Sequence, residues 1–188
     1  MNLSIVSYLD EPTTNAVRKI QHDLSELTGS TASIVSWSPH ITLADGITLE
    51  PNEIAGALQR FELTARQVKC FDVEVSGFGG INDWSPGHGD TATPYVLFLN
   101  VVVNESLLRA VGLLRKTIID YPKWYSMPDP YLPHVTVAFR DLSREGYEFG
   151  TDYLSRINLQ MTSRIDHIAL VEKLPKIDTE FKRILLTD

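Results

Sequence analysis

Cysteine and long hydrophobic runs are almost missing from this chain. Cys70 is the only cysteine, and a single thiol cannot close an internal disulfide. No run of 18 apolar residues is present, which excludes an ordinary transmembrane helix. The chain also does not begin with the charged and then apolar segments of a secretory signal. We therefore expect a cytoplasmic protein with no membrane partner, in which Cys70 serves as a small buried hydrophobe.

Positive charge is scarce as well. The 188 residues include 17 Lys and Arg against 24 Asp and Glu, a net charge of −7. Binding to long nucleic acid without sequence preference depends on neutralising phosphates with Lys and Arg. The composition therefore excludes that class of partner, but it remains compatible with a small phosphate ester held in a locally positive pocket.

The common nucleotide and metal motifs are absent too. The chain has no Gly-Lys-Ser/Thr phosphate loop, no G-x-G-x-x-G, and none of the spacings His-x-His, His-x-x-x-His or His-Glu-x-x-His. The sequence thus predicts no metal site and no cofactor. Its length and its 43% hydrophobic content suit one globular unit that buries a core without disulfides.

The chain does contain one short sequence motif in two copies, which are separated by half the length of the chain. Each copy has a proline, a histidine, a β-branched residue, a threonine, an aliphatic residue and an alanine. Because Pro, His and Thr are uncommon residues, a second copy by chance is roughly a one-in-a-thousand event. The copies are Pro39-His40-Ile41-Thr42-Leu43-Ala44 and Pro133-His134-Val135-Thr136-Val137-Ala138.

Each copy reads as a β-strand, in which residues i and i+2 face the same side. His40 and Thr42 then project together, and so do His134 and Thr136. If the two strands approach each other, two imidazoles and two hydroxyls line one groove. Hydroxyls can donate to phosphoryl oxygens, and imidazoles that titrate near neutrality can serve as base and acid. These four side chains are the candidate catalytic residues.

The paired His-x-Thr motifs resemble those of the two-histidine (2H) phosphoesterase superfamily, which includes RNA 2′,3′-cyclic phosphodiesterases, also called 2′-5′ RNA ligases. The resemblance implies an α+β fold of two lobes with pseudo-two-fold symmetry. It also implies a metal-free active site in the cleft between them.

The order of elements agrees with such a fold. Strand, helix, motif strand and helix occur twice in phase with the motifs, with no linker between the halves. We therefore expect one two-lobed domain over residues 1–188, with two antiparallel-rich sheets lining a central cleft and helices outside. The predicted strands are 3–9, 33–37, 40–43, 71–75, 95–103, 134–138, 163–171 and 181–186, and the predicted helices begin near Pro12, Pro51, Asn104 and Ser143.

Three further residues are candidates for substrate binding. Arg140 follows His134 by an even number of residues, so on a straight strand it would share the histidine's face and could touch phosphate. Trp124 and Tyr125, in a proline-punctuated loop before the second motif, could stack on a base. Each of the three also has a plain alternative, which is an exposed charge or ordinary packing.

The remaining polar features carry weaker expectations. A long glycine-rich loop is predicted from Gly77 to Pro94, where it could act as a lid. Of the other histidines, we expect His22 on the surface, His88 solvated in that loop, and His167 satisfied within a strand.

The sequence thus predicts a monomeric, metal-independent enzyme that hydrolyses a 2′,3′-cyclic phosphate, or an ADP-ribose 1″,2″-cyclic phosphate, on a small nucleotide or an RNA end. Which histidine is the acid and which is the base stays open. Three alternatives remain. They are 2′-5′ RNA ligation at the same site, a non-catalytic nucleotide-binding or RNA-binding module, and a structural domain in which the repeat is accidental.

Overall fold

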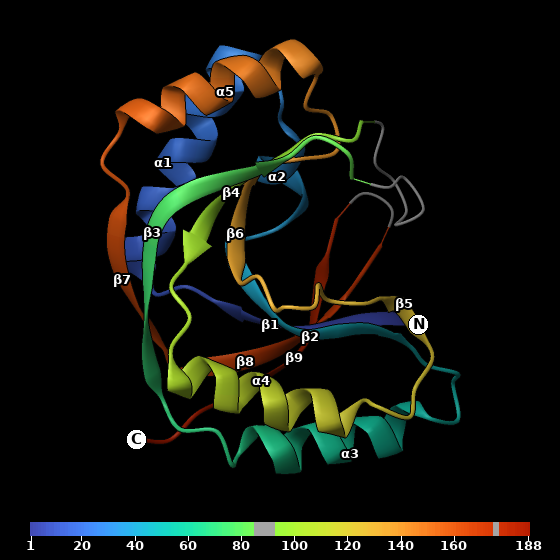
Figure 1. The fold of residues 1–188 in the computed structure, drawn as a ribbon. Helices are drawn as coiled ribbons and strands as arrows, with labels where there is room; N and C mark the ends of the chain where they lie inside the picture. The colour runs from blue at the N-terminus through green and yellow to red at the C-terminus, as the bar shows by residue number, and fades with distance from the viewer. Residues whose placement is uncertain (85–92, 175–176) are drawn as a thin grey trace.

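The computed structural model describes residues 1–84, 93–174 and 177–188. Within these ranges, two curved antiparallel sheets face each other and helices cover their outer sides (Figure 1). The five-stranded sheet has the order β5-β2-β1-β8-β9, and the four-stranded sheet has the order β6-β4-β3-β7. This confirms the predicted α+β class. The strands are β1 Asn2–Tyr8, β2 His40–Thr48, β3 Phe71–Ile81, β4 Val96–Val101, β5 Lys123–Tyr125, β6 His134–Ala138, β7 Gln160–Ile165, β8 His167–Glu172 and β9 Thr179–Leu185.

The longer helices begin at capping residues that the sequence displays. Asp10, Asn104 and Ser143 each accept a hydrogen bond from a backbone N–H in the first turn of the helix that follows, which satisfies a group with no partner inside the helix. Gly29 ends the first helix in the left-handed conformation at φ 76°. The helices are α1 Glu11–Thr28, α2 Ala32–Ser36, α3 Ile54–Ala65, α4 Glu105–Thr117 and α5 Arg144–Arg156.

The two lobes exchange their helices. Helix α1 follows β1 of the five-stranded sheet, yet it packs on β6 and β7 of the four-stranded sheet, beside α5. Helix α4 follows β4 of the four-stranded sheet, yet it packs on β2 of the other sheet, beside α3 (Figure 1). The outer face of each sheet is therefore covered by a helix that directly follows a strand of the other sheet.

The motif strands place their side chains as the alternation predicts. Ile41, Leu43, Val135 and Val137 are buried in the core, while the histidines and threonines between them are half-buried and face the space between the sheets. Strands β2 and β6 belong to different sheets but contact each other. The two motifs therefore meet across the cleft.

The prediction of a strand over residues 33–37 was wrong, because these residues lie in and just after helix α2. The Asp141 carboxylate accepts hydrogen bonds from the backbone N–H groups of Thr31 and Ala32 and so caps the first turn of α2. Asp141 lies about half the chain away in sequence, so local periodicity carries no trace of this cap.

The predicted loop from Gly77 to Pro94 is also shorter than expected. Strand β3 continues to Ile81, with Gly79 opposite Phe98 and Gly80 opposite Leu97 of β4. A Cβ at either glycine would lie within 3.0 Å of a neighbouring aromatic ring, that of Phe98 or Tyr147. The two glycines therefore leave space for these rings to pack on the strand and do not end it. His88 and most of the remaining loop lie outside the described residues, and so does the suggested lid. The segment of Trp124 and Tyr125, expected as a loop, forms β5 and pairs with β2.

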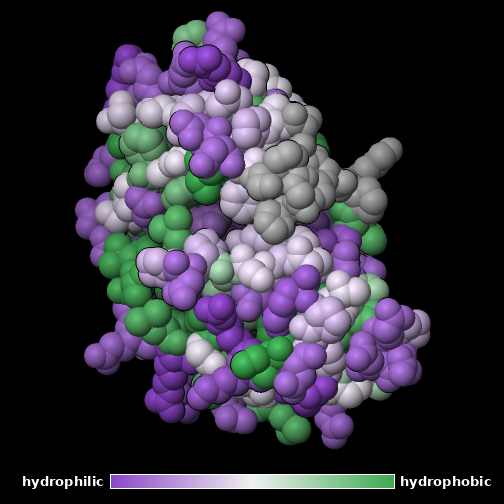
Figure 2. Space-filling view, turned by 45° about the vertical axis from the view of Figure 1, so that its right-hand side comes forward, coloured by the Kyte–Doolittle hydropathy of each residue, from purple (hydrophilic) through white to green (hydrophobic). Residues whose placement is uncertain are grey.

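On the face drawn in Figure 2, hydrophilic side chains predominate and hydrophobic ones lie in scattered groups, as expected for a surface in contact with water. Among the residues that the structure describes, no helix is both long and apolar enough to cross a membrane.

Candidate active site

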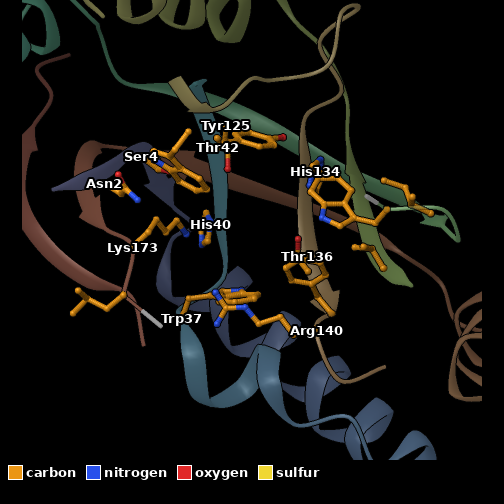
Figure 3. Close-up of a pocket in the computed structure, with 16 residues that line it drawn as sticks. Asn2, Ser4, Trp37, His40, Thr42, Tyr125, His134, Thr136, Arg140 and Lys173 are labelled. Carbon is orange, nitrogen blue, oxygen red and sulfur yellow. The ribbon is translucent and has the colours of Figure 1, made fainter. Parts of the chain in front are cut away.

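A cavity of about 340 Å³ lies between the two sheets, and all seven candidate residues line it. His40 and His134, the first residues of β2 and β6, lie on opposite sides of this pocket (Figure 3). The described residues that line it are Asn2, Ser4, Trp37, His40, Thr42, Ile81, Trp84, Val96, Trp124, Tyr125, His134, Thr136, Phe139, Arg140, Lys173 and Leu174. We call it the first cavity.

The two imidazoles are held in the same way. His40 Nδ1 lies 2.9 Å from the carbonyl oxygen of Ser38, and His134 Nδ1 lies 2.8 Å from that of Leu132. A carbonyl only accepts, so Nδ1 carries the hydrogen in both rings and Nε2 is left for a ligand. The shared prolines stand between carbonyl and histidine and restrict the preceding residue to extended conformations, which explains why proline recurs in both copies.

The electrostatic surroundings of the two rings differ. Burial lowers the pKa of His40 to about 3, aided by the positive charge of Lys173 and by His134, while the Ser38 carbonyl opposes the shift. Burial also lowers the pKa of His134, against the Leu132 carbonyl. Both rings are therefore neutral near pH 7 in the free protein, and His40 resists protonation under an additional positive charge.

Two cations line this pocket within an acidic protein, and one of them, Lys173, is paired with the carboxylate of Asp178, which is not among the lining residues. The Arg140 guanidinium lies 5.0 Å from the centre of the Trp37 ring, and the Lys173 ammonium lies 5.8 Å from it. No carboxylate occurs among the described lining residues. The pocket therefore suits an anion such as a phosphate ester.

Arg140 reaches the pocket by a route that the sequence did not predict. Strand β6 ends at Ala138, and Arg140 has a left-handed backbone with φ 71°. The chain thus turns after the strand and does not carry Arg140 along a straight strand face. Arg140 Nη1 also lies 3.4 Å from Ser36 Oγ, so α2 helps to place the guanidinium.

Aromatic rings form much of the remaining wall. Trp124 lies across Gly46 of β2 and donates its indole N–H to the Leu3 carbonyl at 3.1 Å. Trp84 and Tyr125 stack with their ring centres 6.3 Å apart. Such faces can accept a base or a ribose.

Nine of the sixteen described lining residues were not among the candidates, and two of these nine, Trp37 and Lys173, lie close to His40. Trp37 was assigned to a strand that does not exist, and Lys173 follows β8 without any motif around it. Their proximity to His40 depends on the fold alone. Among the described residues, no group of three or more His, Cys, Asp or Glu side chains could hold a metal ion.

The comparisons with known proteins agree with this geometry. The family model described as the 2′-5′ RNA ligase superfamily matches residues 9–176. No curated relative matches the sequence.

Several solved structures share the fold across nearly the whole chain. TT0787 of Thermus thermophilus is 20% identical with a TM-score of 0.68, and the match covers 98% of this chain and 97% of that one. E. coli LigT complexed with 3′-AMP is 17% identical with a TM-score of 0.63, covering 100% and 98%. Kluyveromyces marxianus Usb1 is 13% identical with a TM-score of 0.51, covering 95% and 96%. With the family match over most of the chain, the resemblance read from the paired motifs is confirmed, and the chain belongs to the 2′-5′ RNA ligase superfamily of two-histidine phosphoesterases.

Proposed function

We propose that this protein is a metal-independent cyclic phosphodiesterase that opens a 2′,3′-cyclic phosphate on a nucleotide or RNA end. The observation that carries the proposal is the pair of imidazoles in one pocket, each with Nδ1 bound to a carbonyl and a threonine two residues on. The complex of the similar LigT with 3′-AMP, a nucleotide monophosphate, supports this substrate class.

In this proposal His40 is the general base. Its ring stays neutral under burial and the charge of Lys173, so Nε2 can take a proton from water. The water oxygen forms a bond to phosphorus, and the bond from phosphorus to one ribose oxygen breaks. The product is a phosphomonoester with a free hydroxyl on the neighbouring carbon.

His134 is the general acid. A bound phosphate places negative charge beside its ring, which raises the pKa of the imidazole and favours the protonated form. The leaving ribose oxygen then takes the proton from Nε2. If the 5′-hydroxyl of a second RNA end takes the place of water, its oxygen bonds to phosphorus while the bond from phosphorus to the 3′ oxygen breaks. The same pair of histidines would then join two RNA ends through a 2′-5′ bond.

The rest of the first cavity binds the phosphoryl group and the nucleoside. Thr42 and Thr136 donate to the non-bridging oxygens, and Arg140 and Lys173 offset the negative charge that builds up on them. A nucleoside packs against the aromatic wall, where Tyr125 and Trp124 lie.

The test is an assay of the purified protein on 2′,3′-cyclic nucleotides in excess EDTA. We expect turnover to persist, and His40→Ala and His134→Ala each to lower kcat by about 10²–10⁴-fold. The double variant should lose far less than the product of the two, because the residues act as a unit. His22→Ala, on the exposed side of α1, is the matched control. Loss of all activity on chelation, or normal turnover in either single variant, would contradict the mechanism.

A further inference from the structure

One side chain outside the first cavity joins the two stretches of chain that carry the motifs. Asp141 follows Arg140 in the turn between β6 and α5, and it is not a lining residue of the first cavity. Its carboxylate nevertheless accepts four hydrogen bonds at the start of α2. The donors are Ser30 Oγ at 2.6 Å, the Thr31 N–H at 2.9 Å, Thr31 Oγ1 at 3.4 Å and the Ala32 N–H at 3.1 Å. Asp141 therefore ties the end of the second motif to the helix that precedes the first motif.

The other end of α2 contacts the guanidinium of Arg140. Helix α2 ends at Ser36, and Trp37 follows it. Arg140 Nη1 lies 3.4 Å from Ser36 Oγ, and the guanidinium lies 5.0 Å from the centre of the Trp37 ring (Figure 3). A helix of only five residues is not held in place by its own hydrogen bonds, so contacts with the rest of the fold decide where Ser36 and Trp37 lie. Asp141 supplies four of these contacts.

The backbone of Arg140 also depends on Asp141. Arg140 has a φ of 71°, a left-handed conformation that is unfavourable for a residue with a Cβ. Such a conformation persists only where the surrounding contacts hold it. The Asp141 N–H donates to the Phe139 carbonyl at 3.0 Å, while the Asp141 carboxylate is fixed on α2. The same residue thus holds both the turn that carries Arg140 and the helix against which the guanidinium packs.

We propose that Asp141 is a positioning residue, which fixes the Arg140 guanidinium in the first cavity without touching the substrate. The inference rests on the proposed function, because that function assigns Arg140 to the phosphoryl group. It goes further by making phosphate binding depend on a solvent-exposed carboxylate outside the pocket. A displaced guanidinium loses the directed hydrogen bonds by which arginine binds a phosphate.

A purely electrostatic role of Asp141 predicts the opposite effect. A carboxylate near a cationic pocket repels an anion, so its removal should strengthen phosphate binding if only its charge mattered. Its removal should weaken phosphate binding if Asp141 positions Arg140. Asparagine separates the two roles further, because it lacks the charge but keeps an oxygen that can accept from the N–H groups of Thr31 and Ala32.

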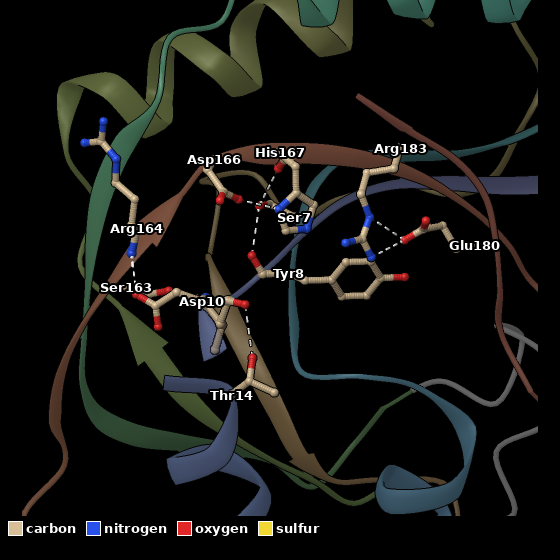
Figure 4. Close-up of polar contacts among 11 residues, drawn as sticks. Ser7, Tyr8, Asp10, Thr14, Ser163, Arg164, Asp166, His167, Glu180 and Arg183 are labelled. Carbon is tan, nitrogen blue, oxygen red and sulfur yellow. Dashed lines mark hydrogen bonds and ion pairs between the residues drawn. The ribbon is translucent and has the colours of Figure 1, made fainter. Parts of the chain in front are cut away.

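Asp10 offers a matched control elsewhere in the fold. Its Oδ1 accepts the Thr13 N–H at 2.9 Å at the start of α1, and its Oδ2 accepts the Arg164 N–H of β7 at 2.9 Å (Figure 4). Asp10 thus also joins a helix start to a distant part of the chain, but it does not line the first cavity. Its replacement by alanine should destabilise the fold to a similar extent without moving Arg140.

The test measures the affinity for 3′-AMP by calorimetry, together with kcat/KM for 2′,3′-cyclic AMP. Asp141→Ala should raise the Kd and lower kcat/KM, each by about 10-fold, the order of one charge-assisted hydrogen bond. Asp141→Asn should recover most of both quantities. In the Arg140→Gln background no guanidinium remains to be placed, so Asp141→Ala should have little further effect. Asp10→Ala should leave the Kd unchanged, and thermal unfolding verifies that each variant folds.

The outcomes separate this inference from the proposed function. Equal or tighter binding in Asp141→Ala, the same loss in Asp10→Ala, or a full 10-fold further loss in the Arg140→Gln background would each overturn the role of Asp141. A protein that binds 3′-AMP but hydrolyses no cyclic nucleotide overturns the proposed function, and calorimetry still decides the role of Asp141. A protein that neither binds 3′-AMP nor hydrolyses the cyclic nucleotide overturns both.

Discussion

At the scale of single residues, the two motif histidines differ in one neighbouring charge. His40 and His134 are held by matching carbonyls, yet Lys173 lies on the His40 side of the pocket (Figure 3). Burial lowers the pKa of His40 most, and the Lys173 ammonium lowers it further because it opposes a second positive charge on that ring. In the proposed mechanism, Lys173 adds to the effect of burial and favours His40 as the base and His134 as the acid.

Replacing Lys173 with methionine should therefore move the acid limb of the pH profile. The base must be neutral to act, so kcat/KM falls as the pH drops through the pKa of His40. Without the ammonium this pKa rises, and the acid limb of kcat/KM shifts to higher pH. The measurement is kcat/KM against pH for the protein and for Lys173→Met. Lys19→Met, which removes an exposed cation from α1, is the control. An acid limb that stays in place would refute the role of Lys173.

The single variant also leaves Asp178 without its cation. The Lys173 ammonium is paired with the Asp178 carboxylate, whose side chain is 2% exposed. Breaking a buried pair from one side costs about 3–5 kcal/mol of unfolding free energy. The double variant Lys173→Met with Asp178→Asn removes both charges, so it should recover much of this stability and still show the displaced acid limb.

The threonines of the motifs test the hydroxyl groups separately from the strands. Valine has almost the shape of threonine and suits a β-strand equally well. Thr42→Val and Thr136→Val should therefore unfold at nearly the same temperature as the parent protein. Each should lose about 10²–10³ in kcat, the usual effect of removing one oxyanion donor. Unchanged turnover in both variants would mean that the hydroxyls do not face the substrate.

At the scale of elements, the sequence predicted what depends on neighbours along the chain. The alternation of His40 to Leu43 predicted which side chains face the cleft. The helix starts predicted at Asn104 and Ser143 are confirmed, and the start predicted near Pro12 lies close to the actual capping residue, Asp10. Helix α2 was missed because its cap, Asp141, comes from the other half of the chain. Lys173 was missed for the same reason. His167 was expected to be fully satisfied within a strand, but its buried Nε2 has no hydrogen-bond partner among the described residues.

The contact between β5 and β2 also depends on packing. Gly46 of β2 pairs with Tyr125 of β5, and a Cβ at Gly46 would lie within 3.0 Å of the Trp124 indole. The lack of a side chain thus lets Trp124 lie flat across the strand, where it lines the first cavity.

Gly46→Ala should therefore push Trp124 away from the pocket wall. We expect a higher KM for the cyclic nucleotide with a smaller change in kcat, and a lower unfolding temperature. Gly112→Ala, on the exposed side of α4 with nothing within 4 Å of the new Cβ, is the matched control. It should be neutral or stabilising by about 0.5–1 kcal/mol, because glycine is a poor helix residue. An unchanged KM in Gly46→Ala would show that the position of Trp124 does not matter for binding.

At the scale of the whole molecule, the exchange of helices links the two lobes. Helix α1 follows a strand of the five-stranded sheet but covers the four-stranded one beside α5, and α4 follows a strand of the four-stranded sheet but covers the five-stranded one. We propose on this basis that residues 1–188 fold as one domain. If one lobe unfolded alone, it would remove a helix that covers the other lobe's sheet and expose that sheet's hydrophobic face.

One unfolding transition should follow from this arrangement. All three tryptophans, Trp37, Trp84 and Trp124, line the first cavity, so their fluorescence reports on the cleft. Far-ultraviolet circular dichroism reports on all helices and strands. In a urea titration the two signals should give coincident curves, as a cooperative unit requires. Two separated midpoints would contradict the single domain.

The unequal surroundings of the two histidines also bear on the identity of the product. A 2′,3′-cyclic phosphate has two ester oxygens on neighbouring carbons, and either can be the leaving group. Two equivalent imidazoles would let the ring lie either way round and yield both positional isomers. In the proposed mechanism His40 is the base, so only the ester oxygen that faces His134 receives a proton. The position of the nucleoside against the aromatic wall would then decide which of the two oxygens leaves. We therefore expect a regiospecific ring opening, with one monophosphate isomer in the chromatogram.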